Sequence, residues 1–167
     1  MKRPIFVAVV STLTASASAQ SSGLFLYELA GPRNFNTVYE VDETRPGVFN
    51  QLVLEIFEFI ADFEYDGTDF WAPSAATNTE LFRVSGANGA RLARINMTFP
   101  AGGNVLTSLE FVDGTLYGGF TSEGGGASSL VTINTTTGLV SLVGAMGINT
   151  PTGGLAYRGG ALYTVNS

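Results

Sequence analysis

Acidic side chains are concentrated in one short segment of the chain, between positions 55 and 69. Carboxylates grouped in this way are able to bind Ca²⁺, which takes about six to eight oxygen ligands. Two carboxyl groups roughly 5 to 10 Å apart are also able to cleave a glycosidic bond as an acid and base pair. The acidic residues of the segment are Glu55, Glu58, Asp62, Glu64, Asp66 and Asp69.

Three aspartates are the candidate calcium ligands, namely Asp66, Asp69 and Asp113. Asp66 and Asp113 stand at similar places in consecutive sequence repeats, so they could converge at one end of a channel. The segment from Asp66 to Asp69 reads Asp-Gly-Thr-Asp, which does not have the spacing of an EF-hand loop and is equally typical of a turn. Calcium therefore stays an alternative, and the first expectation is that there is no cofactor.

The acidic segment also fits a strand with one solvent-exposed face. Apolar and acidic residues alternate over nine positions, which indicates a half-buried strand that ends at Gly67. Glu55, Glu58 and Asp62 are also spaced as one face of a helix, but the alternation covers more positions and favours the strand. The apolar set is Phe57, Phe59, Ala61, Phe63 and Tyr65, and the acidic set is Glu58, Asp62, Glu64 and Asp66.

Several kinds of chemistry are excluded by residue types that the chain lacks. It contains no histidine and no cysteine. Ser-His-Asp and Cys-His nucleophile systems, zinc sites of the usual type and disulfides are therefore excluded. The glycines at 124–126 are followed by no Gly-Lys-Ser/Thr motif, so they predict a flexible loop rather than a phosphate-binding loop. Carboxylate chemistry or an oxygen-bound metal is what remains.

The elements that must position these residues recur with a fixed spacing. A set of four large apolar residues recurs twice, each time 46 positions further along the chain. The three sets are Phe63, Tyr65, Phe70 and Trp71; then Leu109, Phe111, Leu116 and Tyr117; then Leu155, Tyr157, Leu162 and Tyr163. A period of this length is typical of stacked supersecondary units that bury their apolar faces against each other. Trp71, Tyr117 and Tyr163 are expected to fill the space between units, and the alternative is a stacking platform for sugar rings.

Each unit is predicted to contain four short antiparallel strands and no helix. Leu81–Val84 and Leu130–Ile133 are rich in β-formers, and each is followed by a polar turn that ends in glycine, at 85–89 and 134–138. A third strand follows each turn, at 91–98 and 139–145, and 48–56 forms the corresponding strand of the first unit. The expected repeats are 24–67, 68–113, 114–160 and a partial unit at 161–167.

The segment 130–144 (LVTINTTTGLVSLVG), together with Gly154–Tyr157 and Ala161–Tyr163, resembles the repeat of secreted bacterial β-propellers. The resemblance implies an all-β fold, a propeller or an arc of four-stranded blades, and it implies no particular activity. The chain contains three blades and a thirteenth strand, fewer than the four to eight blades usual for propellers. It is expected to be a fragment of a longer propeller, and the alternatives are completion by a second copy and pairing of the last strand with the N-terminal region.

The N-terminus predicts export. Residues 1–19 have a basic start, a short apolar run and a small-x-small site, as in a secretory signal peptide. The remaining domain, 20–167, holds six arginines, no lysine and fourteen acidic residues, a formal charge of −8. This charge argues against a nucleic-acid partner, and no apolar stretch is long enough to span a membrane. The expected location is secreted or periplasmic.

Two hypotheses of function follow from these observations. The first is an exported, non-enzymatic propeller-like module that binds a protein or carbohydrate ligand or has a structural role, with self-association through an open blade edge as one form of partnership. The alternative is a calcium-dependent propeller hydrolase or lactonase that uses its carboxylates. The fixed repeat and the missing catalytic residue types favour the first.

Overall fold

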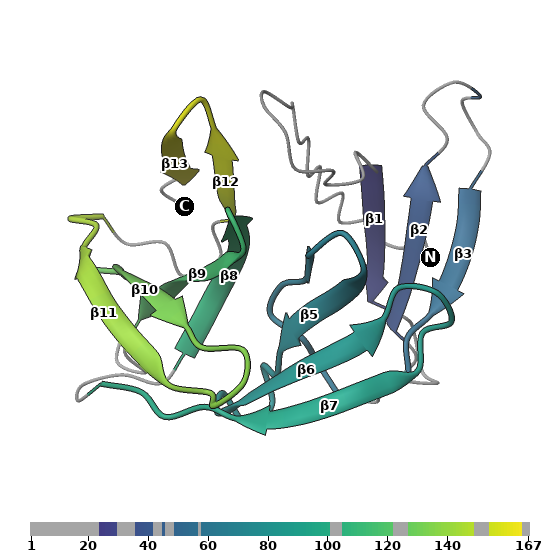
Figure 1. The fold of residues 1–167 in the computed structure, drawn as a ribbon, viewed down its shortest axis with the longest axis horizontal. Helices are drawn as coiled ribbons and strands as arrows, with labels where there is room; N and C mark the ends of the chain where they lie inside the picture. The colour runs from purple at the N-terminus through teal and green to yellow at the C-terminus, as the bar shows by residue number, and fades with distance from the viewer. Residues whose placement is uncertain are drawn as a thin grey trace, which may run out of the picture.

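The structure is a computed structural model that describes residues 24–29, 36–41, 45, 49–56, 58–100, 105–121, 127–148 and 154–164. All elements in these ranges are β-strands (Figure 1), as the sequence predicts. None of the described residues forms a helix that could cross a membrane. The expected signal peptide and the glycines at 124–126 lie outside the described residues, so both remain predictions.

The strands form four antiparallel sheets, which we number 1 to 4 along the chain. Sheet 1 contains β1 (Leu24–Leu29), β2 (Asn36–Val41) and β3 (Phe49–Val53), and sheet 2 contains β4 (Glu64–Tyr65), β5 (Asp69–Pro73), β6 (Glu80–Ser85) and β7 (Arg91–Asn96). Sheet 3 contains β8 (Val105–Val112), β9 (Thr115–Thr121), β10 (Ser129–Ile133) and β11 (Val140–Ala145), and sheet 4 contains β12 (Leu155–Arg158) and β13 (Ala161–Thr164).

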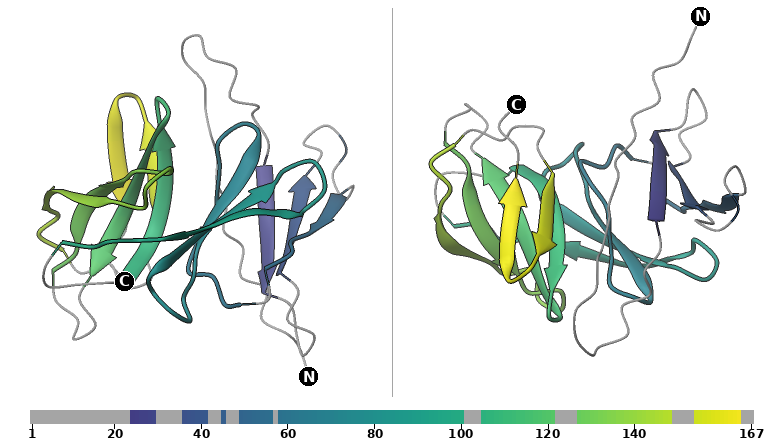
Figure 2. Two further views of the ribbon diagram at one scale, coloured as in Figure 1. Left: turned by 60° about the horizontal axis from the view of Figure 1, so that its bottom comes forward. Right: turned by 90° about the horizontal axis from the view of Figure 1, so that it is seen from above.

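The sheets follow one another around an open arc, with sheets 1 and 4 at its two ends (Figure 1). Both views in Figure 2 show sheet 4 beside β8 of sheet 3, and β3, β7 and β11 lie at the periphery of the arc. Strand order within each sheet follows the chain, so every pairing is a simple antiparallel neighbour. β4, β8 and β12 are the first strands of their sheets, and we call them the inner strands.

The hydrophobic core lies between neighbouring sheets. Phe70 and Phe82 of sheet 2 are fully buried in a cluster with Val38 of sheet 1. A second cluster joins Trp71 and Leu81 of sheet 2 to the apolar face of sheet 3. Its sheet 3 members are Leu106, Leu109, Phe111, Leu116, Phe120, Val131, Ile133 and Val140. A single antiparallel sheet cannot bury its apolar face alone, and each sheet here uses the next one as its cover.

The predicted polar turns are confirmed, and they also join the sheets. Gly89 and Gly138 end the β6–β7 and β10–β11 turns with φ of 75° and 74°, a conformation that favours glycine. A Cβ at Gly138 would overlap the carbonyl oxygen of Asn96 at the end of sheet 2, and a Cβ at Gly89 would overlap that of Val53 in sheet 1. Each turn therefore packs backbone to backbone against the preceding sheet, which only glycine permits.

The predicted strand over 57–65 is largely wrong. Among the described residues of this segment, 58–65, only Glu64–Tyr65 forms a strand, and Ile60 makes an isolated bridge with Ser74. Phe59, placed on the apolar face, is 62% exposed, whereas Glu64, placed on the solvated face, is 5% exposed. The cause is position in the fold: the segment crosses from sheet 1 to sheet 2, and its last residues form an inner strand that is covered on both faces.

The hydrogen-bonded sheets begin one strand earlier than the expected repeats. The boundaries expected at 67 and 113 fall between β4 and β5 and between β8 and β9, and the structure pairs each of these within one sheet. Sheets 2 and 3 each have four strands, the number predicted for one unit, whereas three strands are described in sheet 1 and two in sheet 4. The described sheets do not close into a ring.

Candidate functional site

Three carboxylates lie at the inner strands, where one sheet meets the next. Glu64 belongs to β4, Asp62 precedes it by two residues, and Glu110 belongs to β8. Glu64 and Glu110 are 5% and 3% exposed. Buried carboxylates are rare unless they are paired or hydrogen-bonded, so the partners of these three define what the site can do.

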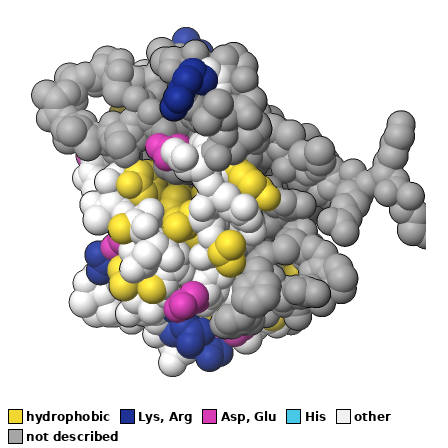
Figure 3. Space-filling model, turned by 90° about the vertical axis from the view of Figure 1, so that its right-hand side faces the viewer, with side chains coloured by type: hydrophobic (Ala, Val, Ile, Leu, Met, Phe, Trp, Pro, Cys, Tyr) yellow, Lys and Arg dark blue, Asp and Glu magenta, His cyan; other side chains and the backbone are white. Residues whose placement is uncertain are grey.

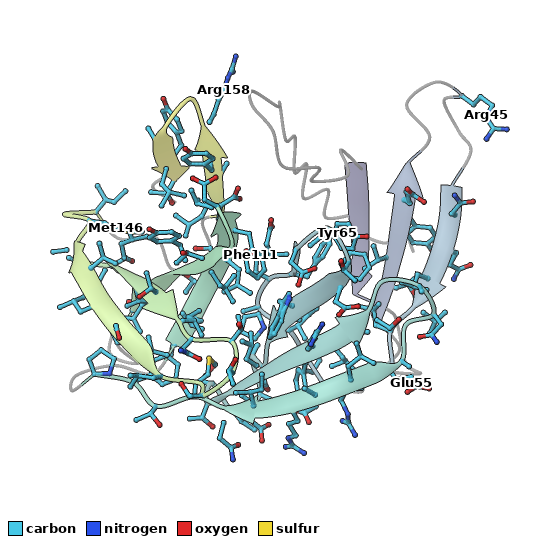
Figure 4. All side chains as sticks on the ribbon, in the orientation of Figure 1. Arg45, Glu55, Tyr65, Phe111, Met146 and Arg158 are labelled. Atoms are coloured by element: carbon cyan, nitrogen blue, oxygen red, sulfur yellow. The ribbon has the colours of Figure 1, made fainter. Side chains whose placement is uncertain are left out.

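Each carboxylate accepts a backbone N–H from the next sheet. The N–H of Leu109 donates to Asp62 at 2.8 Å, the N–H of Phe111 donates to Glu64, and the N–H of Tyr157 donates to Glu110. In every case the donor stands 47 residues after the acceptor. Glu64 and Glu110 are themselves 46 residues apart, so one contact recurs at two successive seams. Figure 4 labels Tyr65 and Phe111, which belong to the inner strands β4 and β8.

The contact has a clear structural use. An inner strand has hydrogen-bonding groups on its open edge that no strand of its own sheet satisfies, and a buried N–H without a partner costs free energy. A carboxylate from the preceding sheet satisfies such a group with a charge-assisted bond. The three side chains therefore clamp sheet 2 to sheet 3 and sheet 3 to sheet 4.

Burial changes how these groups hold protons. Desolvation by burial raises the pKa of Glu110 to about 7, the bond from Tyr157 opposes the rise, and the charge of Asp62 adds to it. Desolvation likewise raises the pKa of Asp62 to about 6, against the bonds from Leu109 and Phe63. Asp62 as a residue is only partly buried, but both its carboxylate oxygens accept backbone N–H groups.

Glu64 shows the same behaviour more strongly. Desolvation by burial raises its pKa well above the ordinary value, and the neighbouring charges of Glu110 and Asp62 raise it further. Three neighbouring acidic groups with raised pKa values release their protons at a higher pH than exposed carboxyl groups do, which is a property of acid and base catalysts as well as of buried structural carboxyls. Both glutamates are buried, so the structure as it stands offers no open substrate path to them.

The seam between sheets 3 and 4 is polar. Alternation along β8 and β9 directs Leu109, Phe111, Leu116 and Phe120 to sheet 2, so the opposite face is directed to sheet 4. That face carries Ser108, Glu110, Tyr117, Gly119 and Thr121. Ser108 Oγ, Glu110 Oε2 and Thr121 Oγ1 are buried there without a hydrogen-bond partner among the described residues.

The terminal sheet adds a fourth such oxygen. Thr164 Oγ1 of β13 is also buried without a partner among the described residues. Leu155, Tyr157, Leu162 and Thr164 are the less exposed residues of sheet 4, so this face packs toward sheet 3. All the orphaned buried side-chain oxygens in the described part of the chain therefore belong to one seam.

Two of the three predicted calcium ligands are occupied by internal contacts. Asp66 accepts the N–H groups of Thr68 and Asp69 through one oxygen and the Trp71 indole N–H, at 2.7 Å, through the other. Asp69 pairs with Arg83, also at 2.7 Å, and accepts the N–H of Gly86. Asp66 and Asp69 do lie together, Asp66 in the β4–β5 turn and Asp69 at the start of β5, where they order the hairpin.

Asp113 lies in a different turn. It is exposed in the β8–β9 hairpin with φ of 49°, a left-handed conformation that aspartate tolerates in turns. Within the described residues, no group of three or more His, Cys, Asp or Glu side chains is placed to hold a metal ion. A calcium site formed by Asp66, Asp69 and Asp113 therefore remains a prediction.

The other two acidic residues of the segment also serve local structure. Glu55 accepts the N–H of Arg91 at 3.3 Å, and its own N–H donates to the carbonyl of Gly89 at 2.8 Å. Glu58 accepts the Ser74 hydroxyl at 3.1 Å. Instead of one cluster, the segment 55–69 distributes its carboxylates between several separate contacts.

The three aromatic residues at 46-residue intervals have different surroundings. Trp71 is 5% exposed and lies edge-on to Phe111, with the rings 6.2 Å apart, so it fills the seam between sheets 2 and 3 as expected. Tyr117 is partly exposed on the polar face of sheet 3, and Tyr163 is 58% exposed on the outer face of sheet 4. The difference follows from the sheet that comes next in the arc. Trp71 is covered by sheet 3, Tyr117 faces the two-stranded sheet 4, and Tyr163 faces no further described sheet.

Sequence reasoning did not single out Glu110, Ser108 or Thr121. A signal was present, because Glu110 occupies the position 46 residues after Glu64 and is the one charged residue of its strand. A carboxylate that recurs at a repeat spacing inside a buried strand indicates a shared partner. The hydroxyl groups gave no comparable signal, since serine and threonine are ordinary residues of exposed strands.

The described part of one outer face shows no comparable concentration of groups. The face on the side of β3 shows hydrophobic side chains interspersed with polar atoms and bordered by charged ones (Figure 3). Val53 and Leu92, at 44% and 53% exposed, are large hydrophobic residues of the peripheral strands β3 and β7. Single exposed apolar residues of this kind are normal on soluble proteins.

The comparisons with known proteins give no information about the site. No protein-family model matches the chain, and no curated protein matches it.

Proposed function

We propose that the chain is an exported, non-enzymatic module that forms part of a β-propeller and has a binding or structural role outside the cytoplasm. Each four-stranded sheet is a blade in this proposal, and the described arc is a sector of a longer ring. The free edge of β13, which has no third strand in the described residues, is where a further strand or a second copy would continue the assembly.

One observation supports this proposal above all. The same carboxylate-to-backbone contact joins Glu64 to Phe111 and Glu110 to Tyr157, with the same spacing. Groups that hold neighbouring blades together are used by the fold, so they are less available for turnover of a substrate. Antiparallel sheets that follow one another around an arc, each with its first strand on the inner side, support the proposal of a propeller.

The calcium-dependent hydrolase or lactonase is the less favoured hypothesis. Its proposed ligands Asp66 and Asp69 already satisfy an indole, a guanidinium and backbone groups. Calcium would have to replace those contacts, and the hairpin between β4 and β5 would lose them.

Two measurements on the purified chain test the proposal. Ester, lactone and glycoside substrates should show no turnover above background, with or without calcium. Addition of calcium or of a chelator should leave the melting temperature unchanged, because a ligand that binds the folded state must stabilise it. Turnover that Glu110→Gln abolishes while the fold is retained would contradict a non-enzymatic role.

A further inference from the structure

We propose that the polar seam between sheets 3 and 4 is a binding site for a small neutral polyhydroxyl molecule, such as a monosaccharide or cyclic polyol. The seam is formed by Ser108, Glu110 and Thr121 on sheet 3 and by Thr164 on sheet 4. The inference rests on the proposed binding role and names the class of ligand.

The first argument is the concentration of unpartnered oxygens. Ser108 is 1% exposed, and its hydroxyl lacks a partner within the described residues, as do Thr121 Oγ1 and Glu110 Oε2. Buried polar groups in folded proteins are nearly always hydrogen-bonded, so each orphan requires an explanation. The two other seams bury apolar clusters around Phe70 and Trp71, which makes this one distinct.

The second argument is the chemistry of the groups. Hydroxyl groups both donate and accept, and so does a protonated carboxyl. Burial raises the pKa of Glu110 to about 7, so its carboxyl carries a proton during part of the time at neutral pH. Such a set matches the hydroxyl groups of a polyol. An anion would be disfavoured by the charge of Asp62, which raises the pKa of both Glu64 and Glu110.

The third argument is the aromatic residue on the same face. Tyr117 lies two residues from Gly119 along β9, pairs with Glu110 across the strands and is only partly buried. An apolar ring beside a few convergent polar groups is the usual composition of a small-molecule site. Gly119 has no side chain of its own, and the Ser108 hydroxyl occupies the space over it.

The ligand enters, in this proposal, when the terminal sheet moves away from sheet 3. Sheet 4 has two described strands, and Ala156, Arg158, Ala161 and Tyr163 on its outer side are exposed. Leu155 is its buried apolar anchor. A small, mostly exposed sheet at one end of a stack belongs to the part of a structure that opens most easily.

The experiment measures binding of D-glucose and myo-inositol to the full chain by calorimetry and by thermal shift. Saturable binding of either should raise the melting temperature. Ser108→Ala and Thr121→Val should each weaken that binding at least tenfold without lowering the melting temperature of the free protein, because neither hydroxyl has a described partner to lose. Ser141→Ala, on the exposed outer strand β11, is the matched control and should bind as the unaltered chain does.

Several results would overturn the site. One is the absence of binding by both probes. Stabilisation by Ca²⁺ or Na⁺ and by neither probe would assign the seam to a cation, and a large loss of stability in Ser108→Ala would show that the hydroxyl is structural. If any of these three results is obtained and the ester, lactone and glycoside substrates are not hydrolysed, the proposed non-enzymatic role stands and only the binding site is refuted. Hydrolysis of a glycoside would contradict the role and leave the site intact.

Discussion

Raising the pH should destabilise the folded chain across the range where most proteins gain stability. Glu110 has a pKa of about 7 in the folded state, against its ordinary value of 4.5. The folded form therefore binds this proton more tightly than the unfolded form. The contribution to stability is fully present below about pH 4.5, and it is lost as the pH rises toward 7.

The size of the effect follows from the shift in the pKa. A tenfold change in proton affinity corresponds to about 1.4 kcal/mol, so the rise at Glu110 corresponds to about 3 kcal/mol. Asp62, whose pKa rises to about 6, acts in the same direction. The two groups interact, so their contributions overlap. Glu80 acts in the opposite direction, because its bond to Arg94 lowers its pKa, and it is expected to cost stability only in strong acid.

The assay is urea unfolding between pH 4 and 8, followed through the fluorescence of Trp71, the only tryptophan of the chain. Its ring lies against Phe111 at a seam between sheets, so it reports directly on separation of sheets 2 and 3. Glu110→Gln retains an oxygen that accepts the N–H of Tyr157 and removes the ionisation. This variant should match the unaltered chain at pH 4 and exceed its stability at pH 8 by up to about 3 kcal/mol.

Glu40→Gln is the control, since Glu40 is exposed on β2. Its pH dependence should equal that of the unaltered chain. The reasoning would be refuted if Glu110→Gln kept the full slope between pH 4.5 and 7, because burial of Glu110 would then not be the source of the dependence. A stability that rises steadily from pH 4.5 to 7 in the unaltered chain would refute it as well.

Two further predictions concern the contacts between sheets. Gly138→Ala should destabilise the chain by about 3 kcal/mol or more, because the new Cβ overlaps the end of sheet 2. Gly147 has a similar φ of 71° but open space around it, so Gly147→Ala should cost only about 1 to 2 kcal/mol for the strained backbone. Equal losses in a thermal unfolding series would show that the overlap is relieved by movement. Trp71→Ala should cost roughly 3 to 5 kcal/mol, as for other large buried aromatics, and Tyr163→Ala should cost under about 1 kcal/mol because its ring is mostly exposed. Circular dichroism melts of both variants check this pair, and similar losses would mean that Tyr163 is covered in solution.

The strands and turns could be predicted from the sequence because local physics decides them. The β6 and β10 segments are rich in β-formers, and each turn ends in a glycine whose positive φ the hairpin requires. The 46-residue spacing also placed Trp71 correctly in a seam between sheets. These are properties of single hairpins and of one recurring position, so they need no knowledge of how the sheets stack.

The carboxylates show what alternation cannot predict. A period of two says that Glu64 and Phe63 are directed to opposite faces, but it does not say whether the second face meets water or another sheet. In an inner strand both faces are covered, so Glu64 is as buried as its apolar neighbours. Its partner, the N–H of Phe111, lies 47 residues away. Because this donor belongs to the backbone, the residue type at position 111 does not reveal the contact.

Within the part of the chain that the structure describes, no single kind of contact joins all the seams of the arc. The glycine turn joins sheet 1 to 2 and sheet 2 to 3, through Gly89 and Gly138, while the glutamate contact joins sheet 2 to 3 and sheet 3 to 4. The position 46 residues after Glu110 is Ala156, which is exposed on sheet 4 and has no carboxylate to offer. A further sheet stacked there would lack the inner contact that Glu64 and Glu110 provide. In a longer propeller, that seam would depend on apolar packing around Tyr163 instead of on a buried carboxylate.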